Sequence, residues 1–467
     1  CCLRSASGKR PGQVEKGPDL QREREMRATG SQPTAIKGFF ASVSKLILVG
    51  TIIRLLLSFW TGHPWDFELW VRLGYQVAHG LNPYTFLQPV KGLSFSGYEA
   101  MTSIGYPPLW AVVCAVAYEI FNVAPNTKYL YYFLLKLPPI IGDIALGYLL
   151  YLSIRKYGKK DRAISALRFW MICPYTVIIS AMWGMFDALT MCFVIACLLL
   201  VESKVGKGAL SLGLGVFLKF LPIIYFPVVA SSLRNNWKRL LFAAGVVAVP
   251  VIFSLLPLVT FGWDISGLLN STASQGMKTA GGAFLSFGEL IQYLYPNQIK
   301  VPEAFIIGSS LVWVPAMLLT YYLIWKRRQG GRNPKQTIGV LLIVTYVFFV
   351  SRMIFNEQYL VYPLALMLVD VTLWHRERKR LFNAIWIISL AYLVANNTML
   401  IRFAAPANIE TWELDIRINN TPPTAEIRYL ANSVLGLALL AAMLRYLARV
   451  VQGVFTVENN ARRKETA

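Results

Sequence analysis

Long apolar runs alternate with polar segments along most of the chain. A helix needs about 20 apolar residues to cross a bilayer, and twelve runs have or approach this length. These runs are 38–60, 129–153, 163–182, 186–202, 208–220, 221–233, 240–261, 303–325, 337–353, 357–374, 381–401 and 426–444. The fifth and sixth runs are short, and we interpret them as a helical hairpin. The pattern therefore predicts an all-α polytopic membrane protein with about twelve transmembrane helices.

The polar segments between these runs differ greatly in length. Most are short, but 61–128, 262–302 and 402–425 are long, and most acidic residues outside the tails fall in them. The first long segment contains an apolar stretch at 106–123, which could be a further span or an interfacial or re-entrant helix. The positions of the positive charges decide between these two interpretations, because basic residues accumulate in cytoplasmic loops.

If 106–123 does not cross the membrane, all the strongly basic loops fall on one side together with both tails. That side then holds 33 of the 46 Lys and Arg residues. If 106–123 does cross, the first of these loops falls outside. The basic loops are 155–160, 204–207, 234–239, 326–335 and 376–380. We therefore expect cytoplasmic N and C termini and a long first outer loop that carries interfacial helices.

The composition excludes several classes of protein. The chain has 467 residues, of which 55% are hydrophobic and 15% are charged, whereas soluble domains carry about 25% charged residues. A soluble enzyme, a disordered protein and a nucleic-acid-binding protein are therefore disfavoured. The net charge of +22, from 46 basic and 24 acidic residues, is explained by loops that orient the protein in the bilayer. Modest cysteine use and the absence of a signal-peptide pattern favour a prokaryotic plasma membrane over the ER membrane.

We divide the chain into four parts. Residues 1–36 are polar and are expected to form a disordered cytoplasmic tail. Residues 37–261 form a first module with spans 1–7 and the first outer loop, residues 262–450 form a second module, and 451–467 form a second cytoplasmic tail. The six cysteines show no metal-ligand spacing and only three histidines are present. We therefore expect neither a metal ion nor another cofactor.

The first outer loop begins with two acidic residues close to the membrane. Asp66 and Glu68 follow the first span within a few residues and alternate with Trp65, Phe67 and Trp70. An ionisable group at this depth is a functional candidate, and partial burial makes a carboxylate a better proton acceptor. The alternative for each residue is an ordinary solvated acid in a loop.

Polar and aromatic motifs follow at several points. They are Asn82-Pro83-Tyr84, Tyr106-Pro107-Pro108-Leu109, Cys173-Pro174-Tyr175, Trp183-Gly184-Met185-Phe186-Asp187, Lys219-Phe220-Leu221-Pro222 and Asn356-Glu357-Gln358-Tyr359 with Tyr362-Pro363. In this order, after the acidic loop, they resemble the GT-C superfamily of multi-span glycosyltransferases, which use polyprenyl-phosphate sugars. The arrangement is similar to the GPI mannosyltransferase that adds the first mannose and to the lumenal glucosyltransferases of N-glycan lipid assembly. The resemblance covers roughly residues 40–370.

The resemblance implies a GT-C fold and an inverting transfer of a hexose, with mannose as the expected sugar. The donor would be a polyprenyl- or dolichyl-phosphate sugar, and the acceptor a lipid-linked or membrane-proximal glycan on the outer or lumenal face. Asp66 would be the base for the acceptor hydroxyl, and Glu68 the reserve, or a group that holds the acceptor or stabilises positive charge on the sugar. Contacts to sugar or acceptor are expected from His63, Trp65, Tyr106, Trp183, Asp187, Asn356, Glu357 and Gln358.

The departing lipid phosphate requires nearby positive charge. Lys219 is the first candidate, because a lone lysine in an apolar run costs about 3 kcal/mol and therefore needs a partner; snorkelling to the surface is the alternative. Arg352 ends the ninth span and suits phosphate through its guanidinium, although it could instead form a salt bridge with Glu357. Lys278 and Arg402 are further candidates, which could simply be solvated.

Two aspartates lie within or beside apolar runs. Asp187 could orient Lys219, contact the sugar, or cap the helix that follows it. Asp143 could pair with Lys136, which stands seven residues earlier on a similar helix face. Each of these pairings would place a compensated charge inside the membrane.

A transporter or flippase for a lipid-linked sugar is the main alternative function, because the span count and the buried charges fit it equally well. The acidic loop after the first span favours the enzyme. The two halves of the chain also do not resemble each other, whereas the halves of many transporters do. A protein O-mannosyltransferase is disfavoured, because that family carries a large soluble insert and no outer loop here is long enough.

Overall fold

The computed structural model describes residues 32–94, 101, 105–123, 127–276, 286–295, 308, 310–326, 333–352 and 355–465. The chain divides into two compact units, Cys1–Leu48 and Val49–Ala467. The boundary between them falls within helix α2 (Gln32–Ser58). Because the described residues begin at 32, most of the N-terminal tail that we expected at 1–36 lies outside them.

Helices make up most of the described chain, and the described part of unit Val49–Ala467 contains no β-strand beyond an isolated bridge between Leu87 and Met101. This confirms the predicted all-α class. The helices are α3 (Pro64–Ala78), α4 (Pro108–Val123), α5 (Lys128–Tyr157), α6 (Lys160–Ile172), α7 (Pro174–Val177), η1 (Ile178–Trp183), α8 (Asp187–Leu200), α9 (Val205–Leu218), η2 (Leu221–Tyr225), α10 (Phe226–Ser232), α11 (Asn236–Phe261), α12 (Ile265–Gly276), α13 (Ser286–Leu294), α15 (Trp313–Lys326), α16 (Pro334–Ser351), η4 (Glu357–Leu360), α17 (Val361–Leu373), η5 (Arg376–Arg378), α18 (Lys379–Asn396), η6 (Thr398–Ala404), α19 (Ile409–Asn420) and α20 (Thr424–Glu465).

Several of these helices are suited to a membrane. Within the described residues, α5, α11, α16 and the Thr424–Val454 part of α20 are long and apolar enough to cross a bilayer. The count rises to six if the bent segments 160–183 and 376–404 each form one span. Helix α11 also leaves large apolar side chains exposed, such as Ile252 and Leu256, as expected of a surface that faces lipid. The helices indicate a membrane-embedded protein, whereas the count of twelve spans stays a prediction, because α8, α9 and η2–α10 are short.

Local sequence signals explain where many helices begin. Proline opens α3, α4, α7 and α16, where its missing N–H costs nothing. The side chains of Thr127, Asn235, Asn333 and Asn408 accept hydrogen bonds from backbone N–H groups at the start of α5, α11, α16 and α19. Helix α20 does not stop where we predicted a C-terminal tail to begin, at residue 451, but continues as a helix to Glu465.

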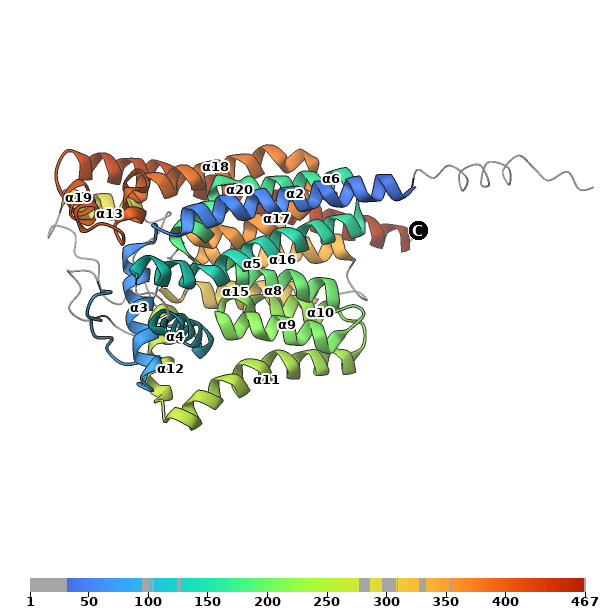
Figure 1. The fold of residues 1–467 in the computed structure, drawn as a ribbon. Coiled ribbons are helices and arrows are strands. Elements are labelled where there is room, and N and C mark those ends of the chain that lie inside the picture. Colours follow the sequence, from blue (N-terminus) through green and yellow to red (C-terminus); the bar gives the residue numbers. More distant parts are fainter. Residues whose placement is uncertain are drawn as a thin grey trace, which may run out of the picture. The chain divides into compact units, whose positions relative to one another are not determined.

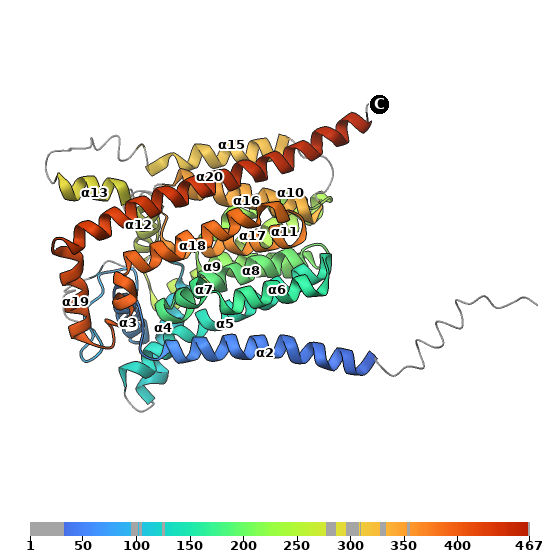
Figure 2. The same ribbon diagram turned by 90° about the horizontal axis from the view of Figure 1, so that it is seen from above.

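The long helices of the unit Val49–Ala467 run along a common direction, and α3, α4 and α12 lie across one end of them (Figure 1). Figure 2 shows α13 and α19 at the same end, and the C-terminal part of α20 at the other. The three long loops meet at the first end: Tyr84 packs against Trp263 and Leu268, and Lys128 donates a hydrogen bond to the carbonyl of Ala407 at 3.0 Å. The short apolar helix α4 thus lies among the elements that cover this end of the long helices (Figure 1). That α4 is an interfacial helix stays a prediction.

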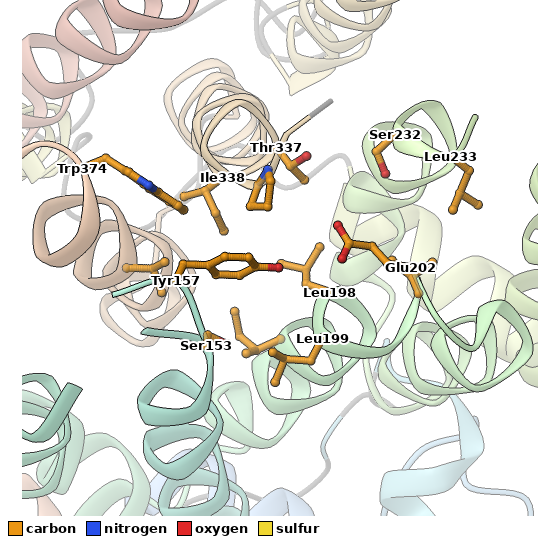
Figure 3. Close-up of a pocket in the computed structure, with 14 residues that line it drawn as sticks. Ser153, Tyr157, Leu198, Leu199, Glu202, Ser232, Leu233, Thr337, Ile338 and Trp374 are labelled. Carbon is orange, nitrogen blue, oxygen red and sulfur yellow. The ribbon is translucent and has the colours of Figure 1, made fainter. Parts of the chain in front are cut away.

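The short connections gather at the opposite end. There the carboxyl ends of α5, α8, α10 and α17 meet the amino end of α16 around a cavity of about 80 Å³ (Figure 3). Tyr157, Glu202 and Trp374 stand among its lining residues and belong to or adjoin the loops predicted to be cytoplasmic. Loops that the charge pattern assigns to one side thus share one end of the helices. That this end faces the cytoplasm stays a prediction.

Candidate functional site

Asp66 stands in the first turn of α3, where the helix dipole favours a carboxylate. His63 precedes the helix in an extended conformation and Pro64 opens it, so the chain turns sharply at this point. The Oδ2 atom of Asp66 accepts a hydrogen bond of 2.7 Å from Nε1 of Trp183, and Nδ1 of His63 lies 3.1 Å from the same oxygen. The side chains of His63 and Asp66 remain 16% and 14% exposed, so the carboxylate can be reached from outside.

Trp183 reaches Asp66 because of an unusual backbone. The segment η1 is a π-helix. This form is rare in proteins, and where it occurs it is often part of a functional site. It ends at Gly184, whose φ of +87° is a left-handed conformation that favours glycine. The indole of Trp183 stacks on the ring of His63 with centroids 4.7 Å apart. The structure thus brings together two motifs that are far apart in the sequence, the acidic loop and the Trp-Gly loop.

Lys136 of α5 fixes the loop that leads to Asp66. Its ammonium donates hydrogen bonds to the carbonyl of Ser58 at 2.6 Å, to the carbonyl of Thr61, and to the hydroxyl of Thr61 at 3.0 Å. The lysine is fully buried, and its charge lies over the ring of Phe67 in α3. These contacts hold the end of α2 against the start of α3.

The pairing that we expected between Lys136 and Asp143 is wrong. Asp143 forms an ion pair of 2.8 Å with Arg54 instead, and it accepts hydrogen bonds from Trp170 and Ser180. The guanidinium of Arg54 also donates to the carbonyl of Met171 at 2.8 Å, so this one side chain connects α5 with α6. Arg54 was missed, although a lone arginine within an apolar run is itself a functional or structural signal.

Glu68 faces inward rather than toward the surface. Its Oε1 atom lies 2.5 Å from Nε of Arg72, one turn later in α3, and both side chains are fully buried. Arg72 also donates to the carbonyl of Leu87 at 3.1 Å, in the loop between α3 and α4. A buried carboxylate requires such a partner. This geometry supports a role for Glu68 in holding the outer loop more than a role as proton acceptor.

Lys219 lies just beyond the end of α9 and pairs with Asp187, the first residue of α8. The ammonium is 2.7 Å from Oδ1 of Asp187, and both side chains are buried. It also lies 5.0–5.5 Å from the ring centroids of Tyr106, Phe186 and Tyr359. Of the roles considered for Asp187, the orientation of Lys219 is the one that these contacts support. The capping position of α8 is occupied by Phe186.

Lys219 and Arg352 line one cavity of about 250 Å³. Its walls include Tyr106 and Tyr359, and its other lining residues are mostly apolar or aromatic: Phe220, Leu221, Ile223, Ile224, Trp313 and Phe348. Arg352 follows the end of α16, and its guanidinium lies over the ring of Phe348. A positively charged wall in an otherwise apolar cavity is suited to a phosphate that carries a hydrocarbon chain.

Tyr106 lines this cavity next to Lys219. Burial raises the pKa of the Tyr106 hydroxyl above its usual range, Lys219 opposes this effect, and the charges of Asp66 and Asp187 reinforce it. The phenol of Tyr106 therefore stays protonated, and its pKa is influenced by the charges of both Lys219 and Asp66. Tyr106 lines the cavity, and the centroid of its ring lies 5.5 Å from the ammonium of Lys219, so its place next to Lys219 has a geometric basis.

A second cavity, of about 400 Å³, lies on the side of His63. It is lined by His63, Pro64, Trp65, Arg402, Trp412, Asp415, Ile416, Asn419, Asn420 and Arg428. Nε of Arg402 lies 3.1 Å from Oδ2 of Asp415. The structure therefore places Arg402 in this cavity and not in the one that holds Lys219 and Arg352. Lys278, the remaining candidate for the phosphate, lies outside the described residues.

The motif Asn356-Glu357-Gln358-Tyr359 connects neighbouring helices. Asn356 precedes η4, and Oε1 of Glu357 accepts hydrogen bonds from Asn396 at 2.5 Å and Asn397 at 3.5 Å. The carbonyl of Glu357 accepts a further one, of 2.5 Å, from the hydroxyl of Tyr175 in α7. Gln358 is buried next to this network. The motif thus connects η4 with α18 and with the segment that carries Trp183.

The described residues contain no group of three or more His, Cys, Asp or Glu side chains that could hold a metal ion. No family model matches the chain, and no curated protein matches it. The function must therefore be argued from the geometry of the site and from the motifs. The central element of that geometry is one accessible carboxylate, Asp66, with a cationic apolar cavity on the side of Tyr106 and a polar cavity on the side of His63.

Proposed function

We propose that the protein is a membrane glycosyltransferase that moves a hexose, with mannose as the expected sugar, from a polyprenyl- or dolichyl-phosphate donor to a glycan acceptor. The observation that carries this proposal is the shared cavity of Lys219 and Arg352, in which Lys219 pairs with Asp187, four residues after the Trp183 that donates a hydrogen bond to Asp66. Two cations in an apolar wall suit a lipid phosphate. The carboxylate of Asp66 suits the base that the transfer requires.

In the proposed reaction, Asp66 accepts the proton of an acceptor hydroxyl. The hydroxyl oxygen forms a bond to the anomeric carbon, and the bond between that carbon and the phosphate oxygen breaks. The electron pair leaves with the lipid phosphate, whose negative charge Lys219 and Arg352 stabilise. Attack from the side opposite the phosphate inverts the anomeric centre, so a β-linked donor gives an α-linked product. The donated proton remains on Asp66 until it passes to solvent.

The neighbours of Asp66 support this assignment. The hydrogen bond from Trp183 fixes the carboxylate and leaves its other oxygen for the substrate. Tyr106 is a protonated donor in the wall of the cavity next to Lys219, where it can contact the sugar. Asp187 holds the ammonium of Lys219 at the cavity wall, and Arg352 adds the second positive charge.

The orientation proposed from the charge pattern places this site at the outer face. Both termini then lie in the cytoplasm, and a prokaryotic plasma membrane is the proposed location. The end of the helices that carries α3, α4, α12 and α19 would face the exterior (Figure 2). Donor and acceptor would approach the site there from the outer leaflet.

The proposal is tested with purified protein in detergent, polyprenyl-phosphate mannose and polyprenyl-phosphate glucose as donors, and a panel of glycolipid acceptors. Product masses are then measured. Asp66→Asn keeps the shape of the side chain and removes the base, so we expect the transfer rate to fall about 10²–10⁴-fold. Asp264→Asn, at an exposed carboxylate of the same end that only caps α12, is the matched control and should be fully active.

An unchanged rate for Asp66→Asn would end its assignment as base. The assay also separates the enzyme from a flippase, because detergent offers no second compartment and a flippase forms no covalent product. If no donor in the panel yields a product of increased mass with any acceptor, glycosyl transfer as proposed is wrong.

A further inference from the structure

The second cavity has the size and the exposure of a ligand site. Its volume of about 400 Å³ falls within the range of small-molecule sites, about 300–1,000 Å³. It is built by the start of α3, by η6, by α19 and by the first turns of α20. His63 forms the wall toward the catalytic centre, since its ring lines the cavity while its Nδ1 lies 3.1 Å from Asp66. A molecule in this cavity is therefore a neighbour of the proposed base.

One lining residue of the cavity, Asn419, carries a buried polar atom without a hydrogen-bond partner among the described residues. Asp415 and Asn419 stand one turn apart on α19 and are 2% and 7% exposed. The amide nitrogen of Asn419 donates to Thr398 at 2.9 Å, to the carbonyl of Asp415 at 2.7 Å and to its carboxylate at 2.9 Å. Two of these three atoms can only accept, so the orientation of the amide is fixed.

The amide oxygen of Asn419 is consequently left without a partner among the described residues. A buried acceptor in this state costs free energy. A ligand hydroxyl that donates to it would remove that cost. The carboxylate of Asp415, already engaged by Thr398 at 2.5 Å and Arg402 at 3.1 Å, is held rigidly beside it and offers further acceptor capacity.

The remaining walls are aromatic and cationic. Trp65 is 45% exposed, and Trp412 of α19 lines the same cavity. Large indole surfaces at a cavity mouth are favourable once an apolar ring face covers them. Arg428 contributes donors, and its guanidinium lies 4.5 Å from the ring of Tyr429. Glu289 of α13 is near Arg428; burial raises the pKa of Glu289 and the guanidinium opposes this effect.

The two cavities differ in the polarity of their walls rather than in net charge. Each is lined by two basic side chains, one of which pairs with a carboxylate: Lys219 with Asp187, and Arg402 with Asp415. Among the described residues, the lining of the cavity of Lys219 and Arg352 contains both cations but not Asp187, and most of its remaining wall is apolar or aromatic, which suits a lipid phosphate. The cavity of Asn419 has a fixed carboxylate, Asp415, which disfavours phosphate, and too many polar groups for a prenyl chain. Tryptophans next to carboxylate, amide and guanidinium groups match the apolar faces and the vicinal hydroxyls of a pyranose.

We propose that this second cavity binds a sugar ring of the acceptor glycan. The inference rests on the proposed glycosyl transfer, which it deepens by placing the binding site for the acceptor sugar in this cavity. It also assigns acceptor recognition to Trp412, Asn419 and Arg428, which belong to the second module and not to the motifs of the first.

The test compares steady-state constants of Trp412→Ala and Arg428→Gln with those of the wild type. We expect the KM for the acceptor to rise about tenfold or more, as the loss of one or two good contacts implies, while the KM for the donor stays within about twofold. Arg417→Gln, on the exposed part of α19, is the matched control and should change neither constant. A rise in the donor KM alone, or no change in the acceptor KM, would overturn the assignment.

A binding measurement keeps this test separate from that of the proposed function. Saturation-transfer NMR with wild-type protein in detergent uses methyl α-mannoside, methyl α-glucoside and inorganic phosphate as probes. We expect transfer to a glycoside and its loss in Trp412→Ala, with no displacement by phosphate. If the glycosides bind in this way but no sugar is ever transferred, glycosyl transfer fails and the sugar site stands. If transfer occurs but no glycoside binds, the sugar site fails alone.

Discussion

At the scale of single residues, Lys219 is held by two kinds of contact that have different consequences. Its ion pair with Asp187 is a structural contact between the end of α9 and the start of α8, whereas its place on the cavity wall is where we propose that it binds the donor phosphate. Removing one member of a buried pair is strongly destabilising, by about 3–5 kcal/mol, but replacing both by apolar residues is often neutral. A pair of variants can therefore separate the two roles.

Lys219→Met alone is expected to lower the melting temperature sharply, because it leaves Asp187 buried without its cation. Lys219→Met/Asp187→Leu should melt close to the wild type and still show a donor KM raised about tenfold or more. The buried pair Arg54–Asp143 provides the control for activity: its double replacement by Met and Leu also removes hydrogen bonds from Trp170 and Ser180 and should lower the melting temperature, but it should leave the donor KM unchanged. If the Lys219 double variant also regained full activity, the lysine would be purely structural.

The sequence indicates single residues of the proposed site, such as Lys219 and Asp66, but not which side chains they contact in the fold. Lys219 is recognisable because a charge in an apolar run needs a partner, and Asp66 because it follows a span. Nothing in the sequence shows that Trp183 bonds Asp66, or that Arg352 shares a cavity with Lys219. The expected Lys136–Asp143 pair failed for this reason: spacing along one helix was used where the neighbouring helix supplied the nearer cation, Arg54.

At the scale of elements, the turn after the π-helix η1 positions Trp183. A Cβ atom on Gly184 would stand 3.0 Å from Cγ of Lys136 and 3.1 Å from a ring atom of Phe67, in a left-handed backbone that alanine rarely adopts. Gly184→Ala is therefore expected to destabilise the protein by roughly 1–3 kcal/mol. It should also lower the transfer rate, because Trp183 would be displaced from Asp66.

The measurement is thermal unfolding in detergent, with Gly206→Ala as the control. Gly206 lies in the first turn of α9 with no atom within 4 Å of the position of its Cβ, so alanine there should be neutral or slightly stabilising. If Gly184→Ala unfolds at or above the temperature of the wild type, the turn can adopt another conformation and the argument fails.

The elements show where sequence patterns are reliable. Each apolar run corresponds to described helices, because twenty apolar residues in a membrane protein have no other way to satisfy their backbone. The breaks within runs were harder to foresee. Pro174 opens α7 after a 48° bend, and a single π-helical segment follows it. These features depend on the packing of Trp170 and Trp183 against other helices and leave no periodic trace in the sequence.

At the scale of the whole molecule, the charge pattern and the fold agree: loops that the positive-inside rule assigns to the same side of the membrane lie at the same end of the helices. Tyr157, Glu202 and Trp374, which belong to or adjoin basic connections, share a cavity at one end of the helices, whereas α3, α4, α12, α13 and α19 lie at the other end (Figures 1 and 2). If the positive-inside rule applies, the two ends lie on opposite sides of the membrane and the site faces outward. This can be tested with single cysteines and a maleimide that does not cross membranes.

Two exposed positions serve as probes, in a background from which Cys1, Cys2 and the partly exposed Cys192 have been replaced. Cys114, Cys173 and Cys197 are buried and shielded. Glu413→Cys on α19 should be labelled in intact cells, whereas Lys204→Cys between α8 and α9 should be labelled only after the membrane is opened. The reverse pattern would place the site inside and remove the outer leaflet as the source of the donor. Labelling of both positions in intact cells would show that the two ends of the helices do not lie on opposite sides of the membrane.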